Sequence, residues 1–473
     1  MPVSGRSVAV ITVGCQSMNP GSNPGVRTVQ VTSLPKAHDR PWSGENMLPM
    51  EVFRNAEDRI LRDHERRGIP TDAIQEVVRL DEGWREVLKN VEDMRRIRNE
   101  TSRLIAQAKK SGDEQAAAKA ISSMKNVQQQ LAEAEKEEEK ARLGRDALRM
   151  RIPNILDLEV PEGDGSDGNL TLATRGPDIE DRDGLRTHNE LLDLHGWADL
   201  ARGAKVTGSR FYFLKGDLAM LDLALQRWAI DRLTTKHGYE LVIPPFMMNT
   251  KAYEGVVDLE DFETVMYGVE PDGYHLIATS EHPLTAMYSQ ELLMPEQLPI
   301  KMVGLSPCFR REVGAHGLSD RGIWRVHQFT KVEQIILCKP EDSDSFHQEL
   351  LDNAIGLWDE MEIPYRVVDI CTGDIGTVAS RKYDIEVWMP AAGQWKEVVS
   401  CSNCRSYQAH RLSIRHRSPE GSVHIHTLNS TAIATSRALA AIIEHHQQED
   451  GTISLPKALH PFLSGKVSIG KSI

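Results

Sequence analysis

The sequence predicts an α+β protein in which a two-helix coiled coil precedes a domain of mixed strands and helices. Two observations lead to this fold class. Between about residues 72 and 150, apolar residues recur at alternating spacings of three and four, as they do in coiled coils. From residue 190 onward, strand-like and helix-like segments alternate, and two of the strand-like segments form a long hairpin.

Composition excludes several classes of protein. Hydrophobic residues make up 40% of the 473 and charged residues 26%, which excludes disorder or collagen along the whole chain. The 56 Lys and Arg against 69 Asp and Glu give a net charge of −13, which excludes a uniformly basic coat but not a local basic surface. No stretch resembles a membrane span. The 6 unevenly spaced cysteines favour reduced thiols and a cytoplasmic location.

Residues 1–46 differ from the rest of the chain, because they are rich in Ser, Gly, Pro and Asn. Their one apolar run, Val8–Ile11, is short for a signal-peptide core. We predict a disordered tail, or a start codon placed too far upstream with Met47 as the natural start. A mitochondrial presequence is the alternative, since acidic residues are scarce there.

Two helices with heptad spacing follow, and the break between them lies at residues 110–113. Such a short connection makes the two helices antiparallel neighbours. The residues at alternating spacings of three and four, most of them apolar, are Trp84, Val87, Val91, Met94, Arg98, Thr101, Ile105 and Ala108 in the first helix, and Ala117, Ala120, Met124, Val127, Leu131, Ala134, Glu138, Ala141, Arg145 and Leu148 in the second.

The first of these helices is basic. Between residues 85 and 110, eight basic residues stand against four acidic ones, a net +4. A rigid basic rod is a candidate surface for nucleic-acid phosphates, and an ordinary solvated helix face is the alternative. The eight residues are Arg85, Lys89, Arg95, Arg96, Arg98, Arg103, Lys109 and Lys110, called the basic face below.

The composition of residues 153–190, with many Gly, Pro and acidic residues, predicts a linker. After it, residues 221–236 read as an amphipathic helix and residues 238–245 as a strand that proline ends. We expect a strand over 274–282, another over 395–400, and a final helix from about 429–431 to 448.

The hairpin of residues 306–337 places chemically active side chains on one sheet face. Alternation along a strand puts Arg310 and Glu312 on one face, and Arg325, Phe329 and Glu333 on one face of the return strand. If the two faces coincide, this surface can hold an anion, stack a ring and bind an amine.

Three further segments add polar groups. Thr279 and Glu281 share a face of the expected 274–282 strand. Glu397 and Ser400 could hold Mg²⁺ with a nucleotide phosphate, although residues three apart on a regular strand point in opposite directions. Arg437 lies in the expected final helix.

Taken together, these segments resemble the signature motifs of class II aminoacyl-tRNA synthetases, and they match the seryl-tRNA synthetase family over about residues 47–473. The matching segments are Gly208–Asp217, the strand that ends at Pro245, Thr279–Glu281, Phe309–Glu312 with Arg325–Glu333, Glu397–Cys404 and Asn429–Arg437.

The resemblance implies a homodimer whose catalytic domain is an antiparallel sheet flanked by helices, with an N-terminal coiled-coil arm. It implies a serine–tRNA ligase that makes seryl-adenylate from L-serine and ATP, releases pyrophosphate and transfers serine to the 3′ end of tRNA(Ser). The arm would grip the long variable arm of that tRNA across the dimer. The implied divisions are 1–46, an arm domain 47–152, the linker 153–190 and a catalytic domain 191–473.

The resemblance also implies roles for individual residues. Arg310 would bridge the α-phosphate of ATP and the serine carboxylate, and Arg437 would bind the γ-phosphate. Glu397 and Ser400 would hold Mg²⁺ with ATP. The other implied ATP contacts are Arg311, Glu312, Val326, Phe329, Val398 and Val399, and the implied serine contacts are Thr279, Glu281, Arg310, Glu333 and Thr431.

Ser280 and Val399 depart from the common family pattern, and the loop 315–321 is variable in such families. Cys401 and Cys404 form a CxxC pair without an obvious second pair, so we expect no zinc. Three alternatives stay open: a non-enzymatic paralogue that binds RNA or protein, an adenylating enzyme that loads a carrier protein, and a sister synthetase of different specificity.

Overall fold

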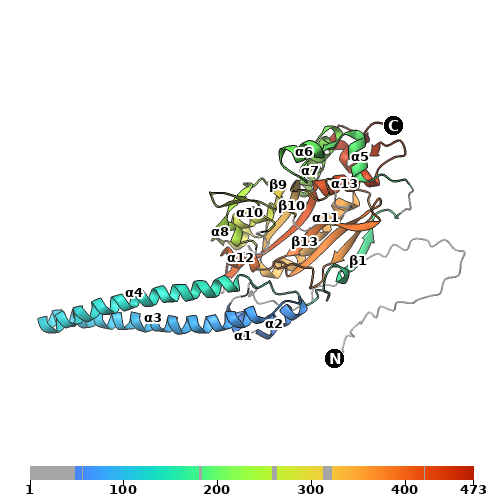
Figure 1. Ribbon diagram of the computed structural model, residues 1–473. Helices are drawn as coiled ribbons and strands as arrows, with labels where there is room; N and C mark the ends of the chain where they lie inside the picture. The colour runs from blue at the N-terminus through green and yellow to red at the C-terminus, as the bar shows by residue number, and fades with distance from the viewer. Residues whose placement is uncertain are drawn as a thin grey trace, which may run out of the picture. The chain divides into compact units, whose positions relative to one another are not determined.

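The two coiled-coil helices are present and run antiparallel side by side (Figure 1). The computed structural model describes residues 48, 50–55, 57–179, 184–257, 264–312, 322–419 and 421–472, so the predictions for residues 1–46 and for the loop 315–321 lie outside the described residues. Helix α3 spans Asp72–Ser111 and α4 spans Glu114–Arg149. Gly112 makes the turn with a φ of 73°, and Asp113 caps α4 by accepting from the Ala116 N–H.

The heptad positions pack as predicted. Val91, Leu131 and Ala134 form a small buried cluster with Met94. At the base of the hairpin the contact is polar instead, because Asp81 pairs with Arg145 at 2.9 Å and the Arg145 guanidinium lies 4.2 Å from the Trp84 ring. These contacts explain why Arg and Trp occupy heptad positions that usually hold aliphatic residues.

Two short helices, α1 (Met50–Asn55) and α2 (Glu57–Arg66), pack beside the base of α3. Their apolar side chains join those that follow α4 in one core cluster, which contains Phe53, Ile60, Val77 and Ile152. Asp81 also binds Arg54 of α1 through two hydrogen bonds of 2.7 and 2.8 Å. The base of the hairpin is therefore fixed by both apolar packing and paired charges.

The rest of the chain is built on an eight-stranded sheet in the order β1-β11-β12-β13-β16-β10-β9-β4. Neighbouring strands are antiparallel except β4 and β9, which are parallel. The strands are β1 (Leu170–Arg175), β4 (Glu240–Val242), β9 (Ile300–Phe309), β10 (Gln328–Cys338), β11 (Tyr365–Asp369), β12 (Arg381–Met389), β13 (Gln394–Asn403) and β16 (His426–Ala434). The predicted fold class is confirmed.

Helices α7 (Gly216–Lys236) and α11 (Ser343–Asp359) pack on the central strands, and α13 (Thr435–His445) packs near one end of them (Figure 1). Alternation along β10 separates two environments. Gln334 donates to the Leu350 carbonyl of α11, whereas its neighbour Glu333 lines a cavity on the other face.

Smaller elements complete the domain. The short helices are α5 (His188–His195), α6 (Leu200–Val206), α8 (Thr250–Glu254), α10 (Glu281–Ala286) and α12 (Tyr407–Arg411). The minor sheets contain β2 (Ala198–Asp199) with β3 (Phe213–Leu214), β5 (Met247–Asn249) with β6 (Gly268–Val269) and β7 (Tyr274–Leu276), β8 (Leu292–Leu293) with β14 (Arg415–Ser418) and β15 (Gly421–His424), and β17 (Ile453–Ser454) with β18 (Ser468–Ile469).

Several expectations about secondary structure were wrong. The segment 153–190, expected to be a linker, contains β1 at the edge of the main sheet and the start of α5. The expected 274–282 strand ends at Leu276, and Glu281 begins helix α10. The expected final helix starts later, because residues 429–434 belong to the buried strand β16 between β13 and β10, and α13 begins at Thr435. Residues 429–434 include Asn, Ser, Thr and Ile, which favour a helix weakly, and pairing with strands on both sides makes them part of the sheet.

None of the helices in the described part of the chain combines the length and the apolar composition that a membrane crossing requires.

Candidate active site

A cavity of about 410 Å³ opens beside β9, β10, β13 and β16. All of the predicted site residues line it except Arg311 and Val399. Arg311 is exposed, and Val399 is buried and outside the cavity lining. The lining residues that the sequence predicts are Thr279, Glu281, Arg310, Glu312, Val326, Phe329, Glu333, Glu397, Val398, Ser400, Thr431 and Arg437.

Arg310 follows the last residue of β9, and backbone pairing with the return strand fixes its position. Its N–H donates to the His327 carbonyl at 2.9 Å, and its own carbonyl is 2.8 Å from His327 Nδ1. The guanidinium lies 5.4 Å from the centre of the Phe329 ring. The hairpin therefore presents a cation beside an aromatic ring, as predicted. The prediction that Arg310, Glu312 and Arg325 lie on its strands was wrong, because β9 ends at Phe309 and β10 begins at Gln328, and Arg325 is not among the lining residues.

Glu312 lies beyond the strand in the left-handed region, with a φ of 45°. Arg210 donates to its carbonyl at 2.6 Å, and the Arg325 guanidinium lies 3.5 Å from its carboxylate. These two cations hold a conformation that a residue with a side chain rarely adopts. The Glu312 side chain thereby reaches the cavity.

Two acidic groups occupy the deep end of the cavity. Burial and the charge of Glu333 raise the pKa of Glu281 to about 7, against the hydrogen bond of 2.9 Å that Gln408 donates to it. Burial also raises the pKa of Glu333, which is 1% exposed, although Lys331 opposes this effect. The Lys331 ammonium lies 2.8 Å from the Glu333 carboxylate and is itself buried.

A β-bulge brings Glu397 and Ser400 into the same cavity. In the pairing of β12 with β13, Ile385 faces Val399 and Glu386 faces Glu397, so Val398 is the extra residue. The bulge reverses the alternation, and two side chains three residues apart both line the cavity. The regular alternation of side chains along a strand would have placed Glu397 and Ser400 on opposite faces of the sheet.

Arg437 of α13 closes this part of the cavity. Its guanidinium donates to the Glu397 carbonyl at 2.8 Å and lies 3.4 Å from the Glu397 carboxylate. Although desolvation opposes ionisation of Glu397, the charges of Arg437 and Lys382 outweigh it and lower the pKa of this carboxyl. Glu397 and Ser400 thus offer an ionised carboxylate and a hydroxyl, the hard oxygen ligands that fit Mg²⁺.

Sequence reasoning missed several lining groups. Lys331 was detectable, because it shares the strand face of Phe329 and Glu333. Gln408 does not line the cavity but donates to Glu281, and it carried no local signal because it lies on a distant helix, α12. The same is true of the lining segment 375–379, which lies between β11 and β12.

The cysteines and histidines considered for zinc are Cys371, Cys401, Cys404, His410, His424 and His426. Within the described ranges, the cysteines are free and buried, and no group of three or more His, Cys, Asp or Glu is arranged to hold a metal ion. The rings of His410 and His424 stack 3.4 Å apart.

The basic face lies along α3, and all of its members are exposed except Arg98. Arg95 pairs with Glu135 of α4 at 2.8 Å and Arg96 with Asp93 at 3.0 Å. Both arginines keep more than half of their side-chain surface exposed, at 51% and 67%. The face therefore stays accessible to an external anion.

Two family models match this chain. The class II core domain of tRNA synthetases (G, H, P, S and T) matches residues 267–446, and the seryl-tRNA synthetase N-terminal domain matches residues 47–156. The first match covers most of the cavity and the second covers the coiled coil. The fold and the cavity are thus those of a class II aminoacyl-tRNA synthetase.

Individual relatives narrow this class. A serine–tRNA ligase of Methanocella arvoryzae is 48% identical over 424 residues, which cover 89% of this chain and 99% of that protein. A seryl-tRNA synthetase of Pyrococcus horikoshii, solved with ATP, superposes with a TM-score of 0.83 at 40% identity, over 90% of this chain and 100% of that one. A cytoplasmic serine–tRNA ligase of Naegleria fowleri, solved with AMP, superposes with a TM-score of 0.79 at 32% identity. The match covers 89% of this chain and 98% of that one.

The chain belongs to the seryl-tRNA synthetase family. The predicted family is confirmed, and with it the enzyme class of aminoacyl-tRNA ligases. Its activity is that of a serine–tRNA ligase.

Proposed function

We propose that the cavity activates L-serine with ATP and that the same site then transfers the seryl group to the 3′ end of tRNA(Ser). The observation that carries this proposal is the convergence of Arg310, Glu333, Glu397, Thr431 and Arg437 on one cavity from four separate segments of the chain. The cations of this cavity suit the phosphates of a nucleotide and the carboxylate of an amino acid. Its carboxylates and its hydroxyl suit the ammonium group and the polar side chain of that amino acid.

Serine binds at the end that contains Glu281 and Glu333. Their carboxylates accept from the α-ammonium group and the side-chain hydroxyl, and Thr279 and Thr431 supply further hydroxyls. A site that pairs the substrate hydroxyl rejects alanine, because its own buried polar groups would lose their partner. This pairing supports serine over other small amino acids.

ATP binds along the hairpin. Phe329 stacks on adenine, the Val326 backbone contacts the ring, and Glu312 accepts from the adenine amino group. Arg310 contacts both the α-phosphate and the serine carboxylate, since a guanidinium matches either oxyanion bidentately. Arg437 binds the γ-phosphate.

Glu397 and Ser400 would hold a Mg²⁺ ion with the bound ATP, and the bulge at Val398 makes that possible. When bound, the ion would neutralise charge on the phosphates.

The chemistry requires orientation more than proton transfer. Arg310 holds the serine carboxylate in line with the α-phosphorus, and the carboxylate attacks while pyrophosphate leaves. Negative charge grows on the phosphoryl oxygens, which fixed cations stabilise. The terminal ribose hydroxyl of the tRNA then attacks the seryl carbonyl of the adenylate, the bond from that carbonyl to the phosphate oxygen breaks, and AMP leaves as the ester forms.

The hairpin of α3 and α4 binds the long variable arm of tRNA(Ser). A rigid helical rod with an exposed basic face suits RNA, whose double helices are read mostly by shape and backbone. We assign residues 47–152 to this arm domain, 191–473 to the catalytic domain and 1–46 to an extension. Residues 153–190 connect the two domains and also supply the edge strand β1 of the catalytic sheet.

We further propose a homodimer in the cytoplasm. Apolar side chains around β4 and β5 are exposed, among them Leu241, Ile243, Phe246 and Met247 at 40–61%. A second copy of the chain would cover them. The free, buried cysteines of the described residues fit a reducing compartment.

A substitution in the cavity tests the residue roles. Arg310→Lys keeps the charge but removes the bidentate fork, so we expect kcat/KM in serine-dependent ATP–pyrophosphate exchange to fall by about 100-fold or more. The control is Arg366→Lys, since Arg366 pairs with Glu386 on the same sheet outside the cavity lining. Equal activity of both variants would refute the role given to Arg310.

A deletion tests the arm. Joining residue 95 to residue 131 through a short Gly-containing turn removes most of the basic face and keeps the base of the hairpin. We expect serine-dependent exchange at the level of the full chain and a loss of at least tenfold in charging of tRNA(Ser). Undiminished charging would refute the arm assignment.

A further inference from the structure

One wall of the cavity is held in place by residues that belong to the arm domain and the linker. This wall is the segment 375–379 between β11 and β12, and each of its five residues lines the cavity. Its backbone carbonyls accept hydrogen bonds from outside the catalytic domain. Contacts of this kind can set the shape of the cavity without touching a substrate.

Four backbone carbonyls between residues 376 and 380 accept these hydrogen bonds. The Asn154 N–H donates to the Thr377 carbonyl at 2.8 Å, and the Asn154 side-chain amide donates to the Val378 carbonyl at 2.9 Å. The Arg67 guanidinium donates to the Gly376 carbonyl. The Asp157 N–H donates to the carbonyl of Ser380, just past the wall, at 2.9 Å.

Asn154 is the central residue of this arrangement. Its side chain is almost fully buried, at 2% exposed, and its amide also donates to the Cys404 carbonyl at 2.9 Å. Cys404 lines the cavity as well, so Asn154 joins two of its walls. The Arg67 guanidinium in turn donates to the Asn154 carbonyl at 2.8 Å, which fixes both groups relative to each other.

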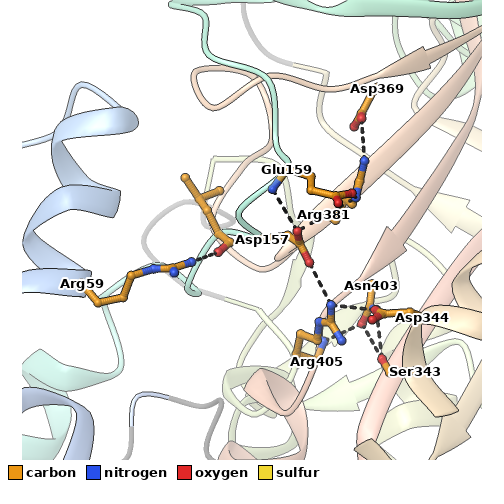
Figure 2. A network of polar contacts seen from close by, with 10 residues as sticks. Arg59, Asp157, Glu159, Ser343, Asp344, Asp369, Arg381, Asn403 and Arg405 are labelled. Carbon is orange, nitrogen blue, oxygen red and sulfur yellow. Dashed lines mark hydrogen bonds and ion pairs between the residues drawn. The ribbon is translucent and has the colours of Figure 1, made fainter. Parts of the chain in front are cut away.

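The linker is anchored further along by a dense network of charges (Figure 2). Arg405 pairs with Asp157 at 2.9 Å and with Asp344 at 2.6 Å. Arg381 pairs with Glu159 at 2.7 Å and with Asp369 at 2.9 Å. Residues 154–157, called the strap below, therefore cannot shift without breaking contacts on both sides of it.

We propose that Asn154 and Arg67 are positioning residues of the active site, which hold the 375–379 wall in the shape that accepts serine. The inference rests on the proposed function of the cavity. The part of the arm domain next to the strap thereby becomes a component of the serine-activation site. The distant part of the hairpin serves tRNA alone.

The serine side of the cavity should respond most strongly. Cys404 neighbours Asn429, whose amide donates to its sulfur at 3.7 Å, and the charge of Glu281 acts on this thiol. Both Glu281 and Asn429 line the cavity. A shift of the wall therefore changes the pocket for the amino acid before it changes the adenine end at Phe329.

The test compares Asn154→Asp and Arg67→Lys with Arg66→Ala in serine-dependent ATP–pyrophosphate exchange of the full chain. Asn154→Asp removes both amide donors at nearly constant volume. Arg67→Lys keeps the charge but replaces the two separate guanidinium nitrogens, which donate to the Gly376 and Asn154 carbonyls, with a single nitrogen on a shorter side chain. Arg66 is the matched control, because it binds the same linker at Val160 and Glu162, beyond the strap.

We expect Asn154→Asp and Arg67→Lys to raise the KM for serine at least tenfold and to change the KM for ATP less than threefold. Arg66→Ala should leave both constants within twofold. Circular dichroism and thermal unfolding identify variants that do not fold. If Asn154→Asp fails to fold, the KM values of Arg67→Lys alone test the proposal.

The proposal is overturned if the folded variants keep the serine KM of the wild type, or if the KM values for serine and ATP rise equally. Failure of the wild type itself to exchange with serine would refute the proposed function instead. The variant with the shortened hairpin adds a contrast, since it should keep the wild-type serine KM.

Discussion

Lys331 provides the cation that faces Glu333 in the buried end of the cavity, and its replacement by methionine is the most informative single change. The ammonium lies 2.8 Å from the carboxylate, and the two residues are 5% and 1% exposed. Methionine is similar in length and apolar, so Lys331→Met removes the charge with little change in packing. Glu333 is then buried near Glu281 without its cation.

The magnitude follows from the cost of an unpaired buried charge, which is about 3–5 kcal/mol when one partner of a buried pair is removed. Glu333 avoids most of this cost by binding a proton. We therefore expect the pKa of Glu333 to rise further above its usual range when the ammonium is removed. The protonated form cannot pair with the ammonium of serine. At neutral pH, kcat/KM for serine should fall by about 10- to 100-fold.

The pH profile of serine-dependent exchange reveals this mechanism. In Lys331→Met, kcat/KM should recover about tenfold per pH unit as the pH rises, because the ionised form of Glu333 returns. Lys331→Arg keeps a cation and should follow the wild type closely. A Lys331→Met profile that superposes on the wild type would refute the reasoning, and so would a loss that does not change with pH.

Three further predictions follow from the geometry. Because the pKa of Glu281 is raised to about 7, kcat/KM for serine in the wild type should decline below pH 7 as this carboxylate gains a proton. Glu281→Gln should abolish that decline. A wild-type profile that stays flat down to pH 5.5 would contradict the role given to Glu281. Gly304→Ala should lower the free energy of unfolding by about 1–3 kcal/mol, since a Cβ there would lie 2.4 Å from Ser280 Oγ. Gly83→Ala in α3 meets nothing within 4 Å and should raise the free energy of unfolding by about 0.5–1 kcal/mol. Thermal unfolding of the two variants distinguishes these outcomes. Chelation of divalent ions should abolish exchange and added Mg²⁺ should restore it, with a several-fold higher Mg²⁺ requirement in Ser400→Ala; an unchanged requirement would remove Ser400 from the metal site.

The parts of the fold that follow one regular period could be predicted from the sequence. The coiled coil was predictable because each helix buries one stripe against one partner, and Val91 and Leu131 are buried where the heptads place them. The hairpin of β9 and β10 was predictable for a similar reason, since Phe329 and Glu333 share a face over a regular ladder.

The parts that depend on a break in the period could not be predicted. The bulge at Val398 joins Glu397 to Ser400, and no local property of the sequence marks it. A second irregularity on β16 lies between Ile433 and Thr431. In these two places the cavity is lined by Glu397, Val398, Ser400 and Thr431, which the resemblance to a family had named, but not by Val399, which it had also named.

Contacts between distant segments were also beyond sequence reasoning. Asn154 lies in a stretch that reads as a linker, yet it is buried and donates to residues more than 200 positions away. Gln408 similarly reaches Glu281 across 127 positions. Such contacts are set by how the whole chain packs, so only the structure reveals them.

ATP–pyrophosphate exchange with each of the twenty amino acids, in the presence of Mg²⁺, tests the central claim most directly. We expect exchange with serine, and a signal for alanine at least about 10⁴-fold lower in kcat/KM, because the carboxylates of the cavity need the substrate hydroxyl as a partner. Exchange that is fastest with another amino acid, or absent with all of them in folded protein, would contradict the account.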